Sequence, residues 1–437
     1  MRTTTRYARG AVRAAMALLA AVPLAASAET LDDAWRIALE QDLSLLAAAS
    51  RVAAAEADVD AARAERKPIV SANVNALELD RTPSFDFSGA GLPIEMPLLD
   101  GSRLVLAGTS VTLPLYTAGR IGAGVRAAEA QRDAEREAAG GLSQEIKLAV
   151  AERYVGVLRA ESAVAVADGQ VASLAAHLRE VEDMYRGGSV PRNDFLAASV
   201  SLADAEQRRL KARNALDVAR AAYNRALGRA LDAPVDLDRE LPNVDARIDD
   251  ETLDALTALA IEQRAEPRRL ASAAEAFAAQ ARAAQAATRP QLGLTGGYVR
   301  VDNEFLDRDD YWAVGVGITW SPFDGGRSRT RAASLSLQAA ALRNQQRDLE
   351  SMIALDVRQA WLTRQETAER VAVAERALEQ ADENLRVARD RYRNGEGTHT
   401  EVLDAEALRT TSLDNFDAAR YEAALARYRL AYAAGVL

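Results

Sequence analysis

The hydrophobic positions follow two different periods along the chain. After Pro68 and again after Pro290, apolar and polar residues alternate with a period of two, which is the pattern of a strand whose two faces have different surroundings. Most of the remaining chain is rich in alanine and carries its charged residues on one side, as amphipathic helices do. The sequence therefore predicts a mainly α protein with a small β part. The strands fall in two pairs, at 69–79 with 103–115 and at 291–301 with 311–321.

The alternation is clearest in the last of these strands, where one face carries large apolar residues and the other carries small ones. The large face consists of Trp312, Val314, Val316, Ile318 and Trp320. Nine residues at about 3.3 Å each, tilted by about 40°, span roughly 20–25 Å of a membrane. The two tryptophans then fall near the two lipid–water interfaces, so we interpret Trp312 and Trp320 as membrane-interface aromatics. A half-buried strand of a soluble sandwich is the alternative.

The predicted helices are too long for a compact domain. Two segments without proline, Tyr116–Tyr185 and Phe323–Tyr392, are each 70 residues long, or about 100 Å at about 1.5 Å per residue. Shorter helices are expected before each strand pair, at Leu31–Lys67 and at about Glu251–Arg289, and again after each turn. Because two short helices placed end to end match one long helix, we predict a tube wall in which long helices run beside pairs of short ones.

The chain contains an internal duplication. Residues 185–188 resemble residues 392–395, and Asp194-Phe195-Leu196 resembles Glu401-Val402-Leu403, both at an offset of 207. Each repeat is expected to consist of a helix, a strand pair, a long helix, a tip and a final helix. The repeats cover 29–250 and 251–437, with tips near 186–193 and 393–400 and an equatorial segment at 229–250 that belongs to the first repeat.

The first 28 residues have the pattern of a secretory signal peptide. Four arginines accompany the apolar run Ala14–Val22, and Ala26-Ser27-Ala28 forms an A-x-A cleavage pattern. We therefore predict a signal peptide at 1–28 and a mature chain that begins near Glu29. No other stretch reaches about 18 consecutive apolar residues, so no transmembrane helix is expected.

Composition narrows the function classes. The net charge of −10 becomes −14 when the four arginines of the signal peptide are removed, and such an acidic chain is not expected to bind nucleic acid. The chain has no cysteine and two histidines, His177 and His399, which we interpret as surface residues; His399, at a tip, would add pH sensitivity. Since no nucleophile–base pair, phosphate loop or metal-ligand spacing is present, we expect no enzyme activity, no metal and no cofactor.

Four strands cannot close a membrane barrel by themselves. An open sheet would expose unpaired edge groups to lipid, and the smallest barrels have about eight strands. Two copies of the chain would give eight strands, and three would give twelve, which is wide enough to enclose a passage. The small polar residues of the inward faces fit a wet lumen, so we favour a homotrimer. The predicted assembly is a trimeric twelve-strand β-barrel, four strands per chain, continued by a long α-helical coiled-coil barrel.

This organisation and several motifs resemble the TolC family of outer-membrane export ducts, over essentially all of the mature chain. The resemblance is carried by the duplicated tip patterns, by the strand ends Leu115–Gly119 and Pro322–Gly326, and by the Thr30-Leu31-x-x-Ala34 start. It implies a barrel in the outer membrane lipid and a helical tunnel that extends into the periplasm. It also implies docking to a periplasmic adaptor (membrane fusion) protein and to an inner-membrane pump or ABC transporter. The lack of an N-terminal cysteine departs from the lipid-anchored branch of the family.

The resemblance also implies roles for the tips. Glu401 and Asp404 share a helix face, and three copies would form a ring of six carboxylates that attracts cations at a periplasmic gate. Asp194 and Tyr392 would hold the coils shut through hydrogen bonds. The implied adaptor-docking residues are Gly187, Gly188, Ser189, Val190, Gly395, Glu396 and Gly397. From the residues alone, acids that favour a helix dipole and glycines that end helices explain the same positions.

The expected function is that of the outer-membrane tunnel of a tripartite export system, which passively conducts small toxic compounds as in multidrug efflux. A type I protein-secretion duct of the same fold is one alternative. A periplasmic adaptor is a second alternative, because adaptors also have long helical hairpins, although that class does not predict duplicated strand pairs with a tryptophan-bounded face.

Overall fold

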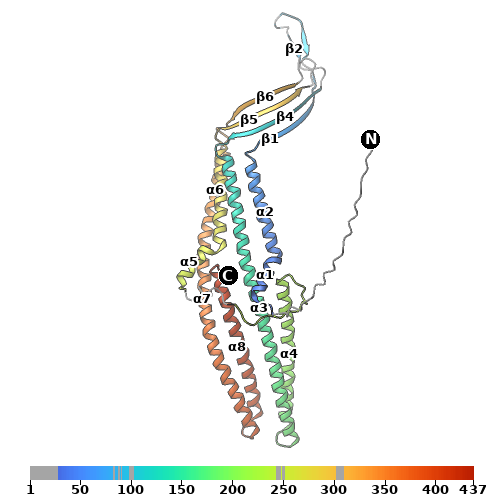
Figure 1. Ribbon diagram of the computed structural model, residues 1–437, viewed down its shortest axis with the longest axis vertical. Coiled ribbons are helices and arrows are strands. Elements are labelled where there is room, and N and C mark those ends of the chain that lie inside the picture. Colours follow the sequence, from blue (N-terminus) through green and yellow to red (C-terminus); the bar gives the residue numbers. More distant parts are fainter. Residues whose placement is uncertain are drawn as a thin grey trace, which may run out of the picture.

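The computed structural model describes residues 28–81, 84–86, 89, 91–97, 103–242, 248, 251–301 and 310–437. These residues form an elongated column with a β-sheet at one end and two helical turns at the other (Figure 1). The predicted signal peptide lies outside the described residues except for Ala28, and so does the end of the predicted equatorial segment from residue 243 onward, except for Ile248. The mainly α chain with four long antiparallel strands is confirmed.

Two long helices run from the sheet to the turns at the far end (Figure 1). α3 covers Arg120–Arg186 and α7 covers Arg327–Arg393, 67 residues each. Each begins directly after a glycine in the left-handed region, Gly119 with φ 88° and Gly326 with φ 86°. Because glycine has no Cβ, it adopts this conformation without strain and lets the chain turn sharply from strand to helix.

The short helices nearer the sheet are each broken in two, whereas the sequence pattern predicts one helix per repeat. The pieces are α1 (Leu31–Gln41), α2 (Leu43–Ala64), α5 (Leu253–Gln263) and α6 (Ala265–Ala286). The breaks fall at Asp42 and Arg264, whose ψ angles of 119° and 139° are extended rather than helical. Asp42 also caps α2, because its side chain accepts hydrogen bonds from the N–H groups of Ser44 and Leu45. The alanine-rich pattern continues across both breaks and therefore does not reveal them.

The other half of the column consists of two helical hairpins. α4 (Arg192–Ala226) packs against α3, and α8 (His399–Ala433) packs against α7. The two hairpins contact each other mainly through α3 and α8. In the sheet half, α6 packs against both α3 and α7, and α2 packs against α3 (Figure 1). Each long helix is thus accompanied along its length by shorter ones.

The four long strands form one antiparallel sheet in the order β1-β4-β5-β6, so the two repeats meet where β4 pairs with β5. The strands are β1 (Ile69–Glu78), β4 (Arg103–Tyr116), β5 (Gln291–Val301) and β6 (Asp310–Thr319). A separate ribbon of β2 (Ser84–Asp86) and β3 (Glu95–Pro97) lies beyond the sheet (Figure 1). Among the described residues, β1 and β6 are edge strands, each paired on one side only.

The register gives the sheet one apolar face and one polar face. One row of aligned residues contains Val70, Val111, Gly296 and Val314, and the next row contains Ser71, Ser110, Gly297 and Ala313. Trp312 and Val314 on the apolar face are 78% and 79% exposed. Trp320 lies one residue beyond β6, and its Nε1 donates a 3.1 Å hydrogen bond to the carbonyl oxygen of Thr288. The two tryptophans therefore mark the two ends of β6.

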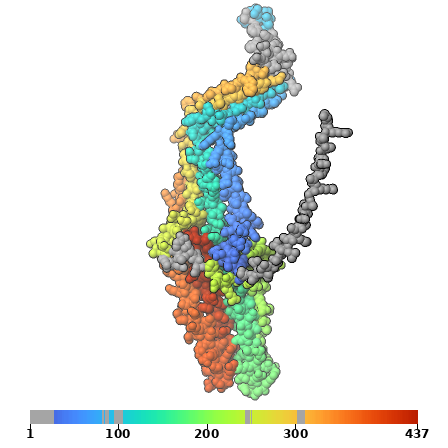
Figure 2. Space-filling view, in the orientation of Figure 1, coloured from blue at the N-terminus to red at the C-terminus, as the bar shows by residue number. Residues whose placement is uncertain are grey.

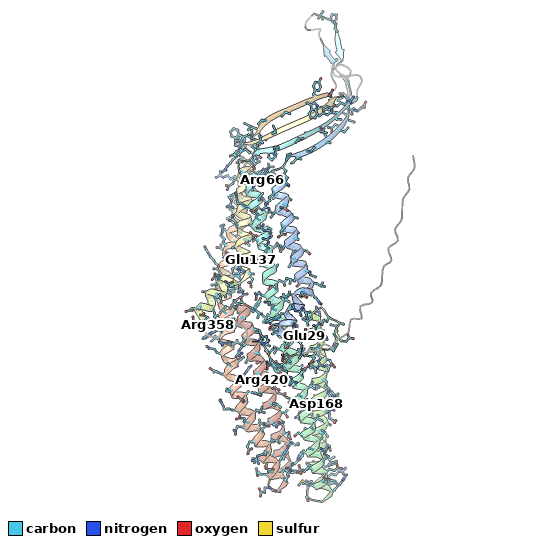
Figure 3. All side chains as sticks on the ribbon, viewed as in Figure 1. Glu29, Arg66, Glu137, Asp168, Arg358 and Arg420 are labelled. Carbon is cyan, nitrogen blue, oxygen red and sulfur yellow. The ribbon has the colours of Figure 1, made fainter. Side chains whose placement is uncertain are left out.

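The main hydrophobic core lies at mid-height, where the short helices are broken. It includes the fully buried tyrosines Tyr154, Tyr223 and Tyr428, and we call this cluster the equatorial core. The described chain after α4, at residues 227–242, wraps over this core and packs on it through Val235 and Leu237. Glu29, which Figure 3 labels at this level, forms a parallel bridge with Leu237. The same level appears as a thickening of the column in Figure 2. The described part of the equatorial segment thus lies where the helices meet end to end.

Candidate functional site at the tips of the hairpins

Both hairpin turns have the same backbone geometry. Gly188 in the first turn and Gly395 in the second have φ angles of 74° and 77°, and their N–H groups donate 3.0 Å hydrogen bonds to the carbonyl oxygens of Tyr185 and Tyr392. These bonds satisfy carbonyl groups at the ends of α3 and α7. Of the seven residues expected to dock an adaptor, five are exposed. These are Gly187, Gly188, Ser189, Gly395 and Glu396; Val190 and Gly397 are half-buried.

Gly397 is needed for close packing rather than for an unusual backbone angle. A Cβ atom at this position would lie 3.1 Å from Glu401 Oε2, 3.2 Å from Arg391 Cβ and 3.2 Å from the backbone nitrogen of Tyr392. These distances are shorter than ordinary van der Waals contacts. The second tip is therefore tightly folded onto the end of α7.

The two acids of the expected gate lie on the first turns of α8, where both are exposed. The backbone N–H of Glu401 donates to the Thr398 hydroxyl, which caps the helix. The Glu401 carboxylate also lies 3.5 Å from the guanidinium of Arg391, which in turn donates to the carbonyl oxygen of Glu396. Glu401 is therefore partly neutralised within its own chain, while Asp404 projects one turn further along the same helix.

Asp194 and Tyr392 come from different hairpins but are not joined by a hydrogen bond within the chain. Tyr392 is only 4% exposed, and its hydroxyl has no partner among the described residues. Burial raises the pKa of Tyr392 to about 12, and the negative charges of Asp194 and Glu180 act in the same direction. The expected closing bond therefore remains a prediction for the assembled protein.

The two histidines are not surface residues, so this interpretation of the sequence is wrong. His177 is 3% exposed and His399 is 5% exposed, and the Nε2 atom of His177 lies 3.1 Å from the Nδ1 atom of His399. Their rings are stacked with centroids 5.0 Å apart, and the ring of Tyr392 contacts both at 5.6 Å and 5.9 Å. The spacing of Leu174, His177 and Val181 on α3 follows the three-and-four pattern of a coiled-coil seam, and this pattern could have identified His177 as buried.

The histidine pair belongs to a small cluster that we call the tip junction. Its apolar members are Val181, Ala198, Leu385, Ala388, Tyr392, Val402 and Ala405, from all four helices of the two hairpins. Beside it, the buried carboxylate of Glu406 on α8 pairs with Arg389 on α7 and accepts a 2.7 Å hydrogen bond from the Ser173 hydroxyl on α3. Arg393 on α7 donates a 2.7 Å bond to Glu180 on α3. Polar contacts thus join the hairpins on one side of the buried rings.

Charge and burial set the proton affinity of the histidines. Burial is the main cause that lowers the pKa of His177 to about 4; the positive charges of His399, Arg389 and Arg393 contribute in the same direction, and the negative charge of Glu180 opposes them. Burial also lowers the pKa of His399, against the opposing charge of Asp194. Both rings are therefore neutral at pH 7. In this state one ring nitrogen donates a proton to the other, which forms the 3.1 Å hydrogen bond.

The described residues offer neither a metal site nor a membrane-spanning helix. No cluster of three or more histidine, aspartate or glutamate side chains in this part of the chain has the geometry of a metal site. None of the described helices combines the length and the apolar composition that a bilayer crossing requires.

Known proteins are similar to this chain in sequence and in fold. A family model described as "Outer membrane efflux protein" matches residues 34–229 and 256–436, one segment in each repeat. The outer membrane efflux protein BepC of Brucella suis is 32% identical over 140 residues, which cover 31% of this chain and 30% of BepC. The chain therefore spans less than a third of the length of this curated relative.

Two solved structures illustrate the likeness of the fold. The outer membrane protein VceC of Vibrio cholerae superposes with a TM-score of 0.79 over 93% of this chain and 96% of VceC, at 19% identity. The open state of the MtrE outer membrane channel of Neisseria gonorrhoeae superposes with a TM-score of 0.73 over 93% of this chain and 88% of MtrE, at 21% identity. At this level of identity the likeness shows the fold, which is that of outer membrane channels.

Proposed function

This chain belongs to the outer membrane efflux protein family, and from that premise we propose that it is the outer-membrane duct of a tripartite export system for small toxic compounds. The protein is located in the outer membrane and extends into the periplasm, and its family consists of efflux channels rather than enzymes. In the proposed system an inner-membrane pump supplies the energy, an adaptor links pump and duct, and the duct itself conducts passively.

The observation that carries this proposal is the sheet with two open edges. Its apolar face is highly exposed and its opposite face is lined by small residues, while β1 and β6 each lack a second partner strand in the part of the chain that the structure describes. Unpaired backbone groups in lipid cost several kcal/mol each. Three copies that pair β6 of one with β1 of the next would satisfy both edges and give twelve strands around a polar lumen. We therefore infer a homotrimer.

The tips would form the periplasmic mouth of this trimer. The exposed turn residues on either side of Gly188 and Gly395 offer backbone and small side chains to an adaptor protein. Glu401 and Asp404 from three copies would place six carboxylates around the opening. A ring of acids favours cations over anions, as in other cation-selective pores. Of the two, Asp404 would contribute more, because Glu401 is paired with Arg391.

Single-channel conductance in a planar bilayer tests the proposal. We expect the purified protein to give a small, cation-selective conductance. The double variant Glu401→Ala/Asp404→Ala should raise the conductance and reduce the cation selectivity. The matched control Glu375→Ala/Glu379→Ala removes two exposed acids from α7 at a distance from the turn and should leave both quantities unchanged.

The possible outcomes separate the parts of the proposal. A channel that responds equally to both double variants would retain the duct and remove Glu401 and Asp404 from its mouth. A protein that extracts from the outer membrane as a monomer and gives no conductance would contradict the duct itself.

A further inference from the structure

The only two histidines of the chain lie against each other at the contact between the two hairpins. His177 comes from α3, and His399 is the first residue of α8; α3 and α8 are the helices through which the hairpins mainly touch. At the duplication offset of 207, the equivalent positions are Asn384 and Arg192. The pair is therefore not a product of the repeat, and it occurs once per chain.

We propose that the His177–His399 pair is a proton-sensitive latch, which holds the two hairpins together when both rings are neutral and releases them when the rings take up protons. The latch is a property of the contact between the hairpins. Only its consequence, a wider mouth at acidic pH, rests on the proposed function.

The hydrogen bond between the rings explains why protons would weaken the contact. A neutral pair shares one proton between Nε2 of His177 and Nδ1 of His399. When both rings are protonated, both nitrogens are donors, the bond is lost, and two positive charges face each other across stacked rings. The remaining nitrogen of His399, Nε2, is buried and has no partner among the described residues. A proton added there has no acceptor, and a buried donor without a partner is costly.

The surrounding charges do not compensate an added proton. On α3 the carboxylate of Glu180 is engaged by Arg393, and on α8 the carboxylate of Glu406 is engaged by Arg389. Both arginines belong to α7 and repel a protonated His177. On α4 the negative charge of Asp194 favours the protonated form of His399, and it therefore opposes the effect of burial on the pKa of that histidine. The other close group, Tyr392, is a neutral phenol throughout this pH range, and burial raises its pKa above the ordinary value.

The sign of the pH effect follows from these pKa shifts. A histidine whose pKa is lowered in the joined state binds its proton more easily when the hairpins separate. The latch is therefore at full strength above pH 6.5, and it weakens as the pH falls toward about 4. At pH 5, His177 alone would shift the equilibrium toward separated hairpins by about 30-fold. His399 acts in the same direction.

The first test measures the histidines directly in the full-length protein. A mature protein with an affinity tag that contains no histidine carries only two such side chains, so ¹⁵N-histidine labelling gives two rings to follow by solid-state NMR in lipid. We expect both rings to be neutral at pH 7, with one N–H···N bond between them, and to take up protons only well below pH 6.5. Two independent rings that titrate near 6.5 would contradict the latch.

The second test measures the separation of the hairpins. Because the chain has no cysteine, spin labels attached to Ser189→Cys and Glu396→Cys report the distance between the two tips. Labelled chains are reassembled with an excess of unlabelled chains, so that distances within one copy dominate. We expect this distance to increase as the pH is lowered from about 7.5 to about 5, with a midpoint between 6.5 and 4.

Two variants keep the second test decisive. His177→Phe/His399→Phe retains two stacked rings that cannot take up protons, and its tips should stay together at about pH 5. If the double variant does not fold, the single variant His399→Phe, which removes the shared hydrogen bond and one charge, should reduce the pH-dependent movement by at least half. Equal movement in the wild type and in a folded variant would overturn the proposal, and so would a wild-type distance that does not change with pH.

Conductance separates the latch from the proposed duct. If the tips separate at acidic pH and the conductance rises in the wild type but not in the double phenylalanine variant, both proposals are supported. If the tips separate and the protein forms no channel, the latch stands and the duct fails. If the protein conducts but the tips do not move, the duct stands and the latch fails.

Discussion

The equatorial core and the tip junction both join the two repeats, but they differ in size and in hydrogen bonding. In the equatorial core, the Tyr154 hydroxyl lies 2.7 Å and 2.8 Å from the carbonyl oxygens of Glu29 and Asp238, and the Tyr428 hydroxyl donates to the carbonyl oxygen of Pro242. In the tip junction, the one buried tyrosine, Tyr392, has a hydroxyl without a partner among the described residues, whereas in the equatorial core only Tyr223 of the three buried tyrosines lacks one.

The difference shows where the molecule is able to move. The equatorial core has many large side chains from helices, breaks and the wrapped segment, so it can open only if much of the fold is lost. The tip junction rests on a small apolar cluster, two neutral rings and a few ion pairs. Local opening requires that few contacts be broken, and the tip junction meets this condition.

Alkaline pH should act mainly on the equatorial core. Burial raises the pKa of Tyr154, Tyr223 and Tyr428 above the usual value of 10, so the stability they contribute is complete below pH 10 and is lost at higher pH. At pH 11 the loss would be about 1.4 kcal/mol for each, or about 4 kcal/mol in total. The tip junction contains one such group, Tyr392. The midpoint temperature of thermal unfolding, measured by circular dichroism between pH 8 and 11, tests this prediction. The prediction would be contradicted if the spin-labelled tips separated at an alkaline pH at which the midpoint temperature had not yet fallen.

A matched pair of leucines compares the cost of a cavity in the two places. Leu158 in the equatorial core is 1% exposed, and Leu385 in the tip junction is 5% exposed. We expect Leu158→Ala to lower the free energy of unfolding by about 2–5 kcal/mol. Leu385→Ala should lower it by less than half as much, because the hairpins can separate without further unfolding. The thermal midpoint and the hydrogen exchange of α8 measure both effects, and equal losses of midpoint would contradict the comparison.

A matched pair of tyrosines isolates the hydrogen bonds. Tyr154→Phe removes the hydroxyl that the carbonyl oxygens of Glu29 and Asp238 share, and of the two only Glu29 keeps a backbone donor among the described residues, the N–H of Asp238, so we expect a loss of about 1–3 kcal/mol. Tyr392→Phe removes a hydroxyl that has no partner in the described part of the chain, and we expect a change within about 0.5 kcal/mol. Thermal midpoints of the assembled protein provide the measurement. A large loss in Tyr392→Phe that disappears in an Asp194→Asn background would instead show that the two residues are bonded in the assembly.

The fold was largely predictable because its signals are local. The alternation that predicts β6 needs only ten residues, and the long helices are marked by the absence of proline between fixed motifs. The breaks at Asp42 and Arg264 were not predictable in this way, because the alanine-rich pattern suits a continuous helix equally well. What places them is the meeting of helix ends with the wrapped segment at mid-height, which is a tertiary effect.

The candidate site was less predictable because it depends on contacts between distant residues. The tip glycines could be read as turn residues from their spacing, and Glu401 and Asp404 as one helix face. The sequence gives no indication that Arg391 pairs with Glu401, or that His177 meets His399 across 222 residues. Histidine occurs both in the interior and on the surface of proteins, so composition alone could not place these two residues, and the surface interpretation was wrong.

The smallest expected effect compares two helix caps. The hydroxyl of Thr30 accepts a hydrogen bond from the N–H of Asp33 at the start of α1, and that of Thr398 accepts one from the N–H of Glu401 at the start of α8. Replacement of either threonine by alanine removes a cap that typically stabilises by about 1 kcal/mol. At the equatorial core, Thr30→Ala should lower the thermal midpoint of the whole protein.

At the tip junction the same substitution should act locally. Thr398→Ala frays the first turn of α8, which begins with His399, so the rings separate more easily and the pKa of His399 moves back toward its ordinary value. We expect the tip distance of the spin-labelled protein to increase at a higher pH than in the wild type, with almost no change in thermal midpoint. Thr30→Ser and Thr398→Ser retain the caps and serve as controls. If Thr398→Ala lowered the midpoint as much as Thr30→Ala does, the tip junction would be part of the cooperative core, and the contrast between the two regions would not hold.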